Sequence, residues 1–497
     1  MSWNAKRAEA RIRAHLRTVP GVEPNVTLAK YAADAALKER GLMDRLPVRR
    51  TFLVEGVHLY GQLLDFDSLV VEDGRETVAS HARVLQFLDM HYRVWDGIID
   101  GESCDRVDYH GARLHAVVTR PEGDPKGQVE RAIALAAKLT EASARVGSVH
   151  GFPSRVRFGI DHGKCLAMST GRAHEKDTLF LGSPANHAAK LAAQSNVEGI
   201  FLTPGAQRIL GAATLRKSAT GDQMALDEAY VRDSARQYRF ERLDRVVARL
   251  SEPEARPPIF RFHRATPPLS TVKFVELVPS NSVRMGMASL FADIDGFTAF
   301  VEDAIQRGSD AIKNAVTTVH VIREELNDVL GEDFGGKRVR FVGDCIHGCL
   351  AAGKAQDDPA DAVKDAVLCA TGMRDSFGLC QKIVNPGATI DLAIGIEYGP
   401  VPLTRIGESG AESIRCAAAR AVVQAEREQQ AISGGGIRLG VQAAGLANPV
   451  VRKHFAAASS IMSYDSAADL LGAVASPVVQ VLRSEPTARP HLVDTKK

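Results

Sequence analysis

Two stretches of the chain repeat the same succession of apolar and polar positions. The first opens with residues 61–67, GQLLDFD, and the second with residues 288–298, ASLFADIDGFT. Both contain the pattern apolar-apolar-Asp-apolar-Asp, which places Asp65 and Asp293 at equivalent points 228 residues apart. Each apolar run predicts a strand, and the apolar spacing after it predicts a helix, over residues 76–99 and 303–330. A repeat of this length predicts two domains of one fold.

The rest of each stretch predicts the same elements in the same order. After the first helix come a hairpin, a second helix, a strand with the pattern Gly-Ile-acid-aromatic-Gly, and a closing Ala-rich helix. This order predicts an α+β domain with a mostly antiparallel sheet and helices on one face. The ranges are 105–117, 128–146, 159–163 and 184–194 in the first copy, and 337–350, 358–377, 395–399 and 413–428 in the second.

Charge and proline content mark the limits of the two copies. We expect a basic helical extension at 1–50, a first domain at 51–234, a linker at 235–280, a second domain at 281–475 and a tail at 476–497. The expected linker contains the charged, Pro-rich run SEPEARPP. The extension carries 11 Lys or Arg against 5 Asp or Glu. That excess predicts a solvated helix, and a membrane-surface or nucleic-acid role is the alternative.

Composition narrows the class of protein. The 497 residues are 45% hydrophobic and 25% charged, as is usual for a globular protein. A net charge of +2 gives no overall basic field, so we expect no nucleic-acid partner. No apolar run reaches the about 18 residues of a membrane span, and no signal core precedes Pro20, so we expect a cytoplasmic protein. Seven cysteines without a CxxC pair are expected to be reduced.

Two carboxylates of the second copy are candidates for a metal site. Asp293 ends an apolar strand, and Asp344 follows Gly343 at the expected hairpin tip. Two carboxylates at one place repel each other unless cations lie between them. Mg²⁺ or Mn²⁺ suits such oxygen ligands, and two metals about 3.5–4 Å apart support in-line phosphoryl displacement. A turn or capping role for both residues is the alternative.

The wider motifs resemble a known family. Residues 291–298, FADIDGFT, and 341–344, FVGD, resemble the two metal motifs of class III adenylyl and guanylyl cyclases. The resemblance covers about 180 residues of each copy. It implies two ferredoxin-like βαββαβ cyclase domains that form an intramolecular pseudo-dimer. It also implies two divalent metal ions, Mn²⁺ or Mg²⁺, on Asp293, Asp344 and the carbonyl of Ile294, with Phe297 and Thr298 against the substrate.

The closing helix of the first copy carries a second family motif. Residues 181–191, LGSPANHAAKL, resemble the family's Gly-x-x-Val-Asn-x-Ala-x-Arg helix. The resemblance implies that Asn186 orients the ribose and that Lys190, in place of Arg, stabilises the reacting phosphorus. The two stand at i and i+4 on one helical face. Lysine supplies the positive charge but lacks the planar two-pronged donor of arginine.

The two copies have complementary losses. The first copy has His110 at the expected position of Asp344, and the second has Cys416, or Arg415 with a one-residue shift, at the position of Asn186. The family's sites form between two domains, with metals from one and the Asn/Arg pair from the other. We therefore expect one working site, built from both copies, and one degenerate site.

The residues at the positions that read the base differ from those of purine cyclases. The family's adenine-reading Asp, seven residues before the Asn, corresponds to Leu179, and its hairpin partner falls near Arg106, with Tyr109 close by. The altered reader, the tandem domains and the Asn-x-Ala-Ala-Lys-Leu helix resemble the pyrimidine cyclases of the Pycsar antiphage system. That resemblance implies conversion of UTP or CTP to cyclic UMP or cyclic CMP plus pyrophosphate, and an effector that responds to the product.

Other functions stay open from sequence alone. The alternatives are an adenylate or guanylate cyclase and a catalytically weak nucleotide-binding regulator. A polymerase-like or diguanylate-cyclase palm is disfavoured because no Gly-Gly-acid-acid-Phe signature occurs. We expect a nucleoside triphosphate substrate, no membrane partner, and a monomer or weak homodimer.

Overall fold

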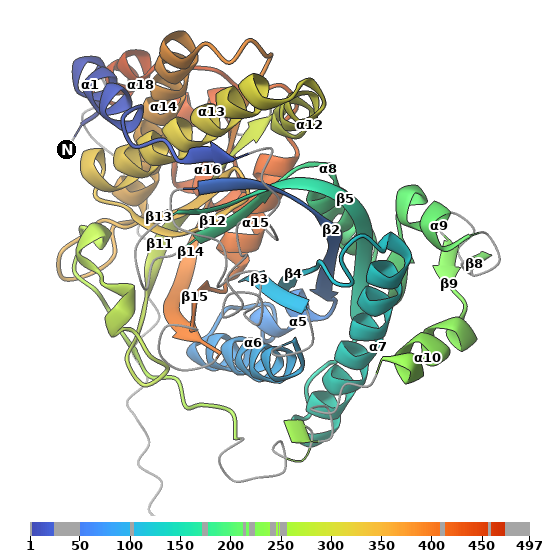
Figure 1. Ribbon diagram of the computed structural model, residues 1–497. Helices are drawn as coiled ribbons and strands as arrows, with labels where there is room; N and C mark the ends of the chain where they lie inside the picture. The colour runs from blue at the N-terminus through green and yellow to red at the C-terminus, as the bar shows by residue number, and fades with distance from the viewer. Residues whose placement is uncertain are drawn as a thin grey trace, which may run out of the picture.

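The computed structural model contains two β-sheets with helices around them (Figure 1). We call the residues of the first sheet and its helices, 50–238, the first half, and residues 256–472 the second half. No helix among the described residues is long and apolar enough to cross a membrane. The structure describes residues 2–23, 50–99, 104–170, 177–211, 215–217, 224–238, 245–246, 248, 256–407, 413–455 and 459–472.

The first sheet has the strand order β3-β4-β2-β5-β7-β9-β8, with β1 paired to β2 and β6 to β5. Its strands are β1 Gly21–Glu23, β2 Arg50–Leu63, β3 Cys104–His110, β4 Arg113–Val118, β5 Val156–Thr170, β6 Asp177–Leu181, β7 Gly199–Leu202, β8 Leu215–Lys217 and β9 Met224–Leu226. The helices are α5 Phe66–Val70, α6 Val78–Ile99, α7 Pro125–His150, α8 Ser183–Ala193, α9 Pro204–Leu210 and α10 Glu228–Gln237.

The second sheet has the order β12-β13-β11-β14-β15, with β10 paired to β11 and β16 to β14. Its strands are β10 Phe262–His263, β11 Ser282–Asp295, β12 Lys337–Val342, β13 Cys345–Leu350, β14 Asp391–Ile406, β15 Ile414–Ala417 and β16 Gly436–Leu439. The helices are α12 Phe297–Arg307, α13 Ser309–Asp328, α14 Pro359–Val384, α15 Arg420–Gln430, α16 Val441–Leu446, α17 Pro449–Phe455 and α18 Tyr464–Gly472; shorter turns are Leu269–Thr271, Phe274–Glu276 and Val329–Asp333.

Helices cover both faces of each sheet. Phe158 and Ile160 of β5 bury their side chains in the core that includes α6 and α7. Gly159 between them faces the other way, and a Cβ there would lie 2.2 Å from the carbonyl oxygen of Ala188 in α8. Gly395 of β14 stands in the same relation to Ala425 of α15, at 2.1 Å. The expectation of helices on one face of each sheet was therefore wrong. Gly159 and Gly395 have no side chain, so the backbone of a helix packs directly against the other face of the sheet.

Two expected helices have different limits in the structure. The helix expected at 303–330 is divided by Gly308, whose φ of +94° ends α12 and precedes α13. The closing helix expected at 413–428 begins later, because Ile414–Ala417 forms β15 and pairs with β14 before α15 starts at Arg420. The strand expected at 61–67 is also displaced, because β2 ends at Leu63 and α5 begins at Phe66; the remaining expected strands and helices are present with small shifts at their ends. All seven cysteines are free and buried, as expected.

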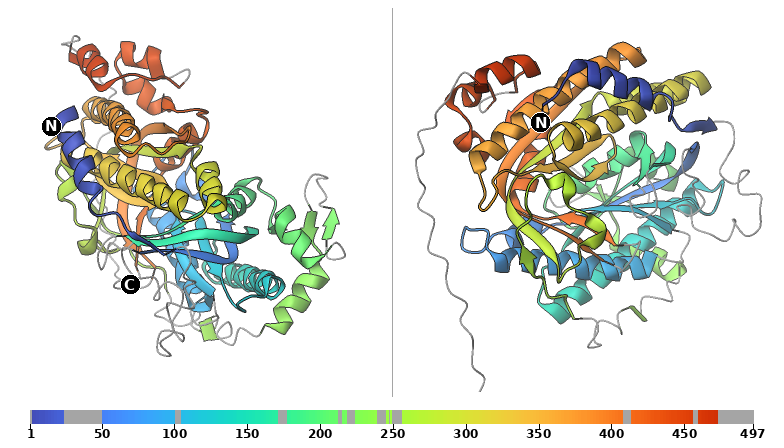
Figure 2. Two further views of the ribbon diagram at one scale, coloured as in Figure 1. Left: turned by 45° about the horizontal axis from the view of Figure 1, so that its top comes forward. Right: turned by 90° about the vertical axis from the view of Figure 1, so that its left-hand side faces the viewer.

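The N-terminal segment connects the two halves. Helix α1, Ala5–His15, lies along α13 and α14 of the second half (Figure 2). Ile12 is buried in that half's core, and the Trp3 indole Nε1 donates to Ser376 Oγ at 2.8 Å. Strand β1 then pairs with β2 of the first half. The helix is present as expected, but one face is buried rather than solvated. Residues 24–49 and the expected tail, 476–497, lie outside the described residues.

Arg11 holds α1 on the second half through buried carboxylates. Its guanidinium lies 2.7 Å from Glu325 Oε1 and 2.9 Å from Asp333 Oδ2, and both carboxylates are almost fully buried. We predict that Arg11→Ala lowers the free energy of unfolding by about 3 kcal/mol, because it leaves Glu325 buried without its cation. Urea unfolding measures the loss. The control is Arg13→Ala, which breaks the exposed Arg13–Glu9 pair and should cost less than about 1 kcal/mol. Equal effects of the two changes would contradict the prediction.

Candidate active site

Asp293 and Asp344 are brought together by neighbouring strands. Asp293 lies near the end of β11, and β11 pairs with β13 through Ala292 and Ile346. Asp344 lies in the tight turn between β12 and β13, where Gly343 has a φ of +62°. That backbone conformation is open to glycine at little cost. The turn therefore sets the Asp344 carboxyl beside the strand that carries Asp293.

The two carboxyl groups repel each other. Burial, and then the charge of Asp293, raises the pKa of Asp344 well above its usual value. Burial, Asp295 and Glu426 raise the pKa of Asp293 to about 6. The backbone N–H of Ile294 donates to both groups, and Gln429 Nε2 donates to Asp293 Oδ2 at 3.4 Å.

This donor set fits a hard divalent cation. Two crowded carboxylates, with a backbone carbonyl at Ile294 beside them, are the oxygen ligands that Mg²⁺ and Mn²⁺ prefer. A bound cation removes the repulsion that raises both pKa values. No Arg or Lys forms a salt bridge with Asp293 or Asp344 within the part of the chain that the structure describes. The residues present therefore fit the metal role expected from the sequence.

Helix α8 brings Asn186 from the first half to this loop of the second half. The Asn186 side-chain amide donates to Thr298 Oγ1, five residues after Asp293 and in the first turn of α12. One turn earlier in α8, Ser183 Oγ donates to Glu302 Oε2 at 2.7 Å. The first turns of α8 and α12 thus meet across the interface (Figure 1).

Lys190 lies one turn further along α8 than Asn186. Its side chain is exposed and has no hydrogen-bond or ion-pair partner among the residues that the structure describes. Helical spacing of four residues places it on the same face as Asn186. A free ammonium group one turn from the interface remains available to a phosphate.

The two residues after Gly296 differ in their surroundings. Thr298 is half-buried and contacts Asn186, as described above. Phe297 is only 2% exposed and packs in the core of the second half, with its ring centroid 5.9 Å from that of Phe300. The structure therefore brings Thr298 to the interface, whereas Phe297 is buried and stabilises the start of α12 through its core contacts.

Leu179 supplies no polar group to a base. It lies in β6, opposite Met168 of β5, and is 3% exposed. It belongs to the apolar cluster that continues into the core of the second half. A leucine in this place contributes apolar contact and cannot accept a proton from adenine.

Tyr109 and Arg106 pack against α6 of the first half. Tyr109 is fully buried, stacks on Tyr92 of α6 at 3.9 Å and donates to Asp96 Oδ1 at 2.9 Å. Arg106 Nε lies 3.3 Å from the same oxygen of Asp96. The structure therefore does not bring either residue together with Asn186. A bulge in β3 between Arg106 and Asp108 causes this, because it puts 106 and 109 on one face.

Several polar and aromatic residues on the other face were missed from sequence. Asp108 forms an ion pair with Arg340 of the second half at 3.1 Å. Tyr60 stacks on His115 at 4.3 Å, and His115 Nε2 lies 3.0 Å from His58 Nδ1. Tyr60 pairs with Gly159, which faces α8, so this cluster lies beside Asn186's helix. The alternation of side chains along β2 could have predicted that Tyr60 faces α8. The position of Asp108 could not be predicted in this way, because a bulge interrupts the alternation along β3.

Strand register corrects which residues are equivalent in the two halves. In the first sheet, Gln62 lies opposite the residue two positions before Gly159. In the second sheet, Asp293 lies opposite the residue two positions before Gly395. Gln62 is therefore the counterpart of Asp293. Asp65, which we had matched to Asp293, instead corresponds to Gly296, because each directly precedes a helix.

The hairpin and the closing helix need the same correction. The turn Gly111-Ala112 matches Gly343-Asp344, so Ala112 rather than His110 replaces the second carboxylate. Helix α15 packs on Gly395 as α8 does on Gly159, which makes Val423 the counterpart of Asn186, in place of Cys416 or Arg415. Arg427 is then the counterpart of Lys190.

The second interdomain site has therefore lost both metal carboxylates and the asparagine. A cavity of about 230 Å³ remains there, lined by residues from β2, the β3–β4 turn and α15. Protein cations neutralise its acidic groups. Asp65 lies 2.5 Å from Arg155, Asp67 lies 2.5 Å from Arg427, and Glu426 pairs with Arg113. The charges at this second site are therefore paired by protein groups.

Comparisons with known proteins identify relatives of the chain. Residues 65–240 match the family described as the adenylate and guanylate cyclase catalytic domain. A uridylate cyclase of a Rhizobium species is 39% identical over 491 residues, covering 92% of this chain and 93% of that protein. A uridylate cyclase of Pseudomonas aeruginosa is 34% identical over 499 residues, covering 97% of this chain and 94% of that protein.

A solved structure shares the whole fold. The crystal structure of a class III adenylyl cyclase-like ATP-binding protein from Pseudomonas aeruginosa superimposes with a TM-score of 0.84 at 32% identity. The superposition covers 95% of this chain and 100% of that one. The nearly full-length match to two cyclases, together with this shared fold, shows that the chain belongs to the family of class III nucleotide cyclases.

Proposed function

We propose that the protein converts a pyrimidine nucleoside triphosphate, UTP in preference to CTP, to its 3′,5′-cyclic monophosphate and pyrophosphate. The observation that carries the proposal is the contact of Asn186 of the first half with Thr298 of the second, which lies five residues after Asp293. The names of the two nearly full-length relatives, both uridylate cyclases, support uracil as the base.

The proposal includes the organisation of the chain and its setting. The two cyclase domains are residues 51–234 and 281–475, joined by the linker 235–280, within one chain that is a monomer or weak homodimer. We place the protein in the cytoplasm, where its cyclic product activates an effector of a Pycsar antiphage system. Support for this setting comes from the resemblance of the sequence to that family.

Asp293, Asp344 and the carbonyl of Ile294 are the proposed ligands of two ions, Mn²⁺ or Mg²⁺. When bound, these ions lower the pKa of the ribose 3′-hydroxyl and neutralise the triphosphate. Asn186 leaves Thr298 and holds the ribose in position for attack on the α-phosphorus. Lys190 balances the charge that develops on the phosphoryl oxygens as pyrophosphate leaves. Thr298 lies at the phosphate end of the site.

The base pocket is proposed to read a small, uncharged base. The aromatic stack of Tyr60 on His115 provides apolar contact near α8, and Leu179 contributes from the apolar cluster shared with the second half. Arg106 and Tyr109 act indirectly, by fixing the position of β3, because both hold this strand against α6. Phe297 keeps the metal loop in place through its core contacts.

We predict that the purified full chain with Mn²⁺ forms cyclic UMP faster than any other cyclic nucleotide when UTP, CTP, ATP and GTP are supplied separately. Mass spectrometry of the products measures the rates. Formation of cyclic AMP alone would refute the pyrimidine assignment and favour adenylate cyclase activity, in line with the description of the solved relative as ATP-binding. No product from any of the four nucleotides would support a nucleotide-binding regulator instead.

Asp293→Asn is predicted to abolish the response of stability to Mn²⁺. The wild-type melting temperature should rise by roughly 5–10 °C at a hundredfold excess of Mn²⁺ over its Kd, and that of the variant should not. The pH dependence follows from the raised pKa of Asp293. The folded state keeps a proton that the unfolded state releases between pH 3.8 and about 6, so this group's contribution to stability is lost as pH rises through that window.

Without metal, Asp293→Asn should therefore be more stable than the wild type, and the difference in stability should be larger at pH 7.5 than at pH 4. Thermal unfolding in EDTA at both pH values measures the difference. Asp303→Asn is the matched control, since it removes a carboxylate from an exposed ion pair on α12 and should change neither response. The metal assignment fails if Mn²⁺ still stabilises Asp293→Asn.

Lys190→Ala is predicted to lower kcat by about 10²–10³-fold with a smaller change in KM, because its charge acts mainly on the transition state. Lys190→Arg should retain most activity, since it keeps the charge. Steady-state kinetics with the preferred nucleotide separate the two parameters. The matched control is Lys126→Ala, an exposed lysine of α7 that should leave both unchanged. A loss confined to KM would contradict the role.

A further inference from the structure

Glu426 is a charged residue that the cyclase mechanism leaves without a role. It lies on α15 of the second half and faces the β3–β4 turn of the first half. Its carboxylate forms an ion pair with Arg113 and lies 3.6 Å from His110 Nε2. Its side chain is only 16% exposed. Arg113 and His110 hold the pKa of Glu426 well below its usual range, so it stays ionised.

Although Glu426 lines the degenerate site, it is also close to the carboxylate pair. One turn further along α15, Gln429 donates to Asp293 Oδ2 at 3.4 Å. The ring of His110 packs against Phe291, two residues before Asp293 in β11, at 5.7 Å between centroids. Glu426 is accordingly one of the charges that act on Asp293.

Arg113 approaches the same place from the first half. Its charge acts on Glu426 and on Cys345, the residue after Asp344. Arg113 and Cys345 are counterparts in the two hairpins, which face each other across the interface. A positive and a negative charge, one from each half, thus lie side by side close to Asp293 and Asp344.

We propose that Glu426 and Arg113 are positioning residues that set the affinity of the Asp293–Asp344 pair for divalent cations, Glu426 raising it and Arg113 lowering it. The inference rests on the proposed metal role of the two aspartates. A buried negative charge near a cation site strengthens cation binding, and a buried positive charge weakens it. The effect is large because buried charges are screened less than exposed ones. The degenerate site thereby acts on the working one through α15.

The pair has no equivalent on the other side of the pseudo-dimer. The position in α8 that matches Glu426 is Ala189, and the hairpin position that matches Arg113 is Cys345. The first half's turn has lost its metal carboxylate, with Ala112 in its place, and its neighbour Arg113 now contacts the second half. An ion pair present on one side only cannot follow from the shared fold.

The test measures Mn²⁺ affinity of the full chain by electron paramagnetic resonance, without nucleotide. Arg113→Gln should bind Mn²⁺ roughly tenfold more tightly, and Glu426→Gln roughly tenfold more weakly. The double variant Arg113→Gln/Glu426→Gln should return to within about threefold of wild type. Arg113→Lys, which keeps the charge, should match wild type. Arg155→Gln removes the same charge from the exposed pair with Asp65 and serves as the control, with no change.

Shifts of opposite sign separate an electrostatic role from a structural one. If both single variants weaken Mn²⁺ binding and the double variant weakens it further, the proposal is overturned, because a packing role gives that result. Glu426→Gln has nearly the same shape as the native side chain, so it decides the outcome alone if Arg113→Gln does not fold in thermal unfolding. If wild type binds no Mn²⁺, or Asp344→Asn binds it equally, the metal site itself is refuted, and the inference with it.

Discussion

Contact between the first turns of α8 and α12 is the constraint on which the candidate site depends. The carboxylates belong to one half and the asparagine and lysine to the other, so neither half holds a complete site. Close approach of α8 to its own sheet is possible because Gly159 has no side chain, and the same approach brings Asn186 forward to Thr298. Local packing inside the first half therefore decides the geometry between halves.

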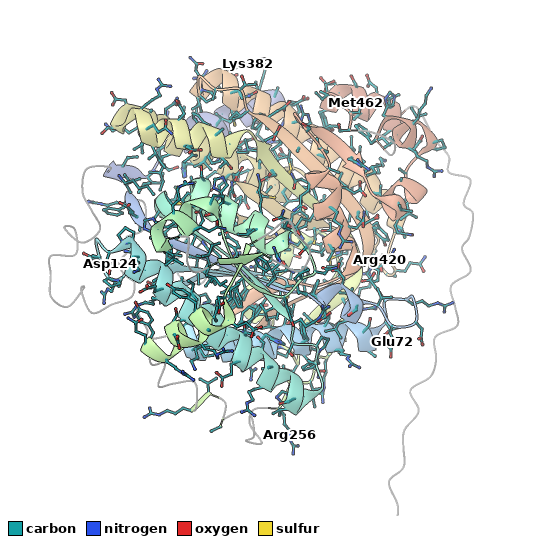
Figure 3. The ribbon with its side chains drawn as sticks, turned by 90° about the vertical axis from the view of Figure 1, so that its right-hand side faces the viewer. Glu72, Asp124, Arg256, Lys382, Arg420 and Met462 are labelled. Carbon is teal, nitrogen blue, oxygen red and sulfur yellow. The ribbon has the colours of Figure 1, made fainter. Side chains whose placement is uncertain are left out.

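The two sites of the pseudo-dimer have diverged through charge. On the working side, Asp293 and Asp344 crowd together with no basic partner among the described residues, which leaves room for cations. On the degenerate side, arginines occupy the acidic groups, with Arg155 on Asp65 and Arg427 on Asp67. Further polar contacts join the halves on that side. Glu76 of the first half accepts from the backbone of Arg420, which lies near Glu72 in Figure 3.

Sequence patterns predicted the element order well, because each expected element has a clear apolar period. They also singled out Asp293 and Asp344, which the structure brings together, since both stand in runs whose turn glycines fix their backbone. The equivalences between copies were less accurate. Matching Asp65 to Asp293 followed a letter pattern, whereas the sheet register that assigns Gln62 depends on long-range pairing.

The direction of side chains was the second feature that the sequence did not predict. The family resemblance suggested that Arg106 and Tyr109 lie near the base, but one bulged residue puts both on the face of β3 that packs against α6. The start of α15 was misplaced for a similar reason. Ala-rich residues 417–419 look helical, yet Ile414–Ala417 completes the edge of β14, and that hydrogen-bonding partner is distant in sequence. Such choices are made by tertiary pairing, which overrides local preference.

The N-terminal segment gives the assembly a second, non-covalent connection between its halves. The linker joins the end of the first half to the start of the second, while α1 packs on helices of the second half and β1 pairs with β2 of the first half. Two domains tethered in one chain meet at a local concentration that dilution does not change. Contact between the two halves is thus independent of the concentration of the chain.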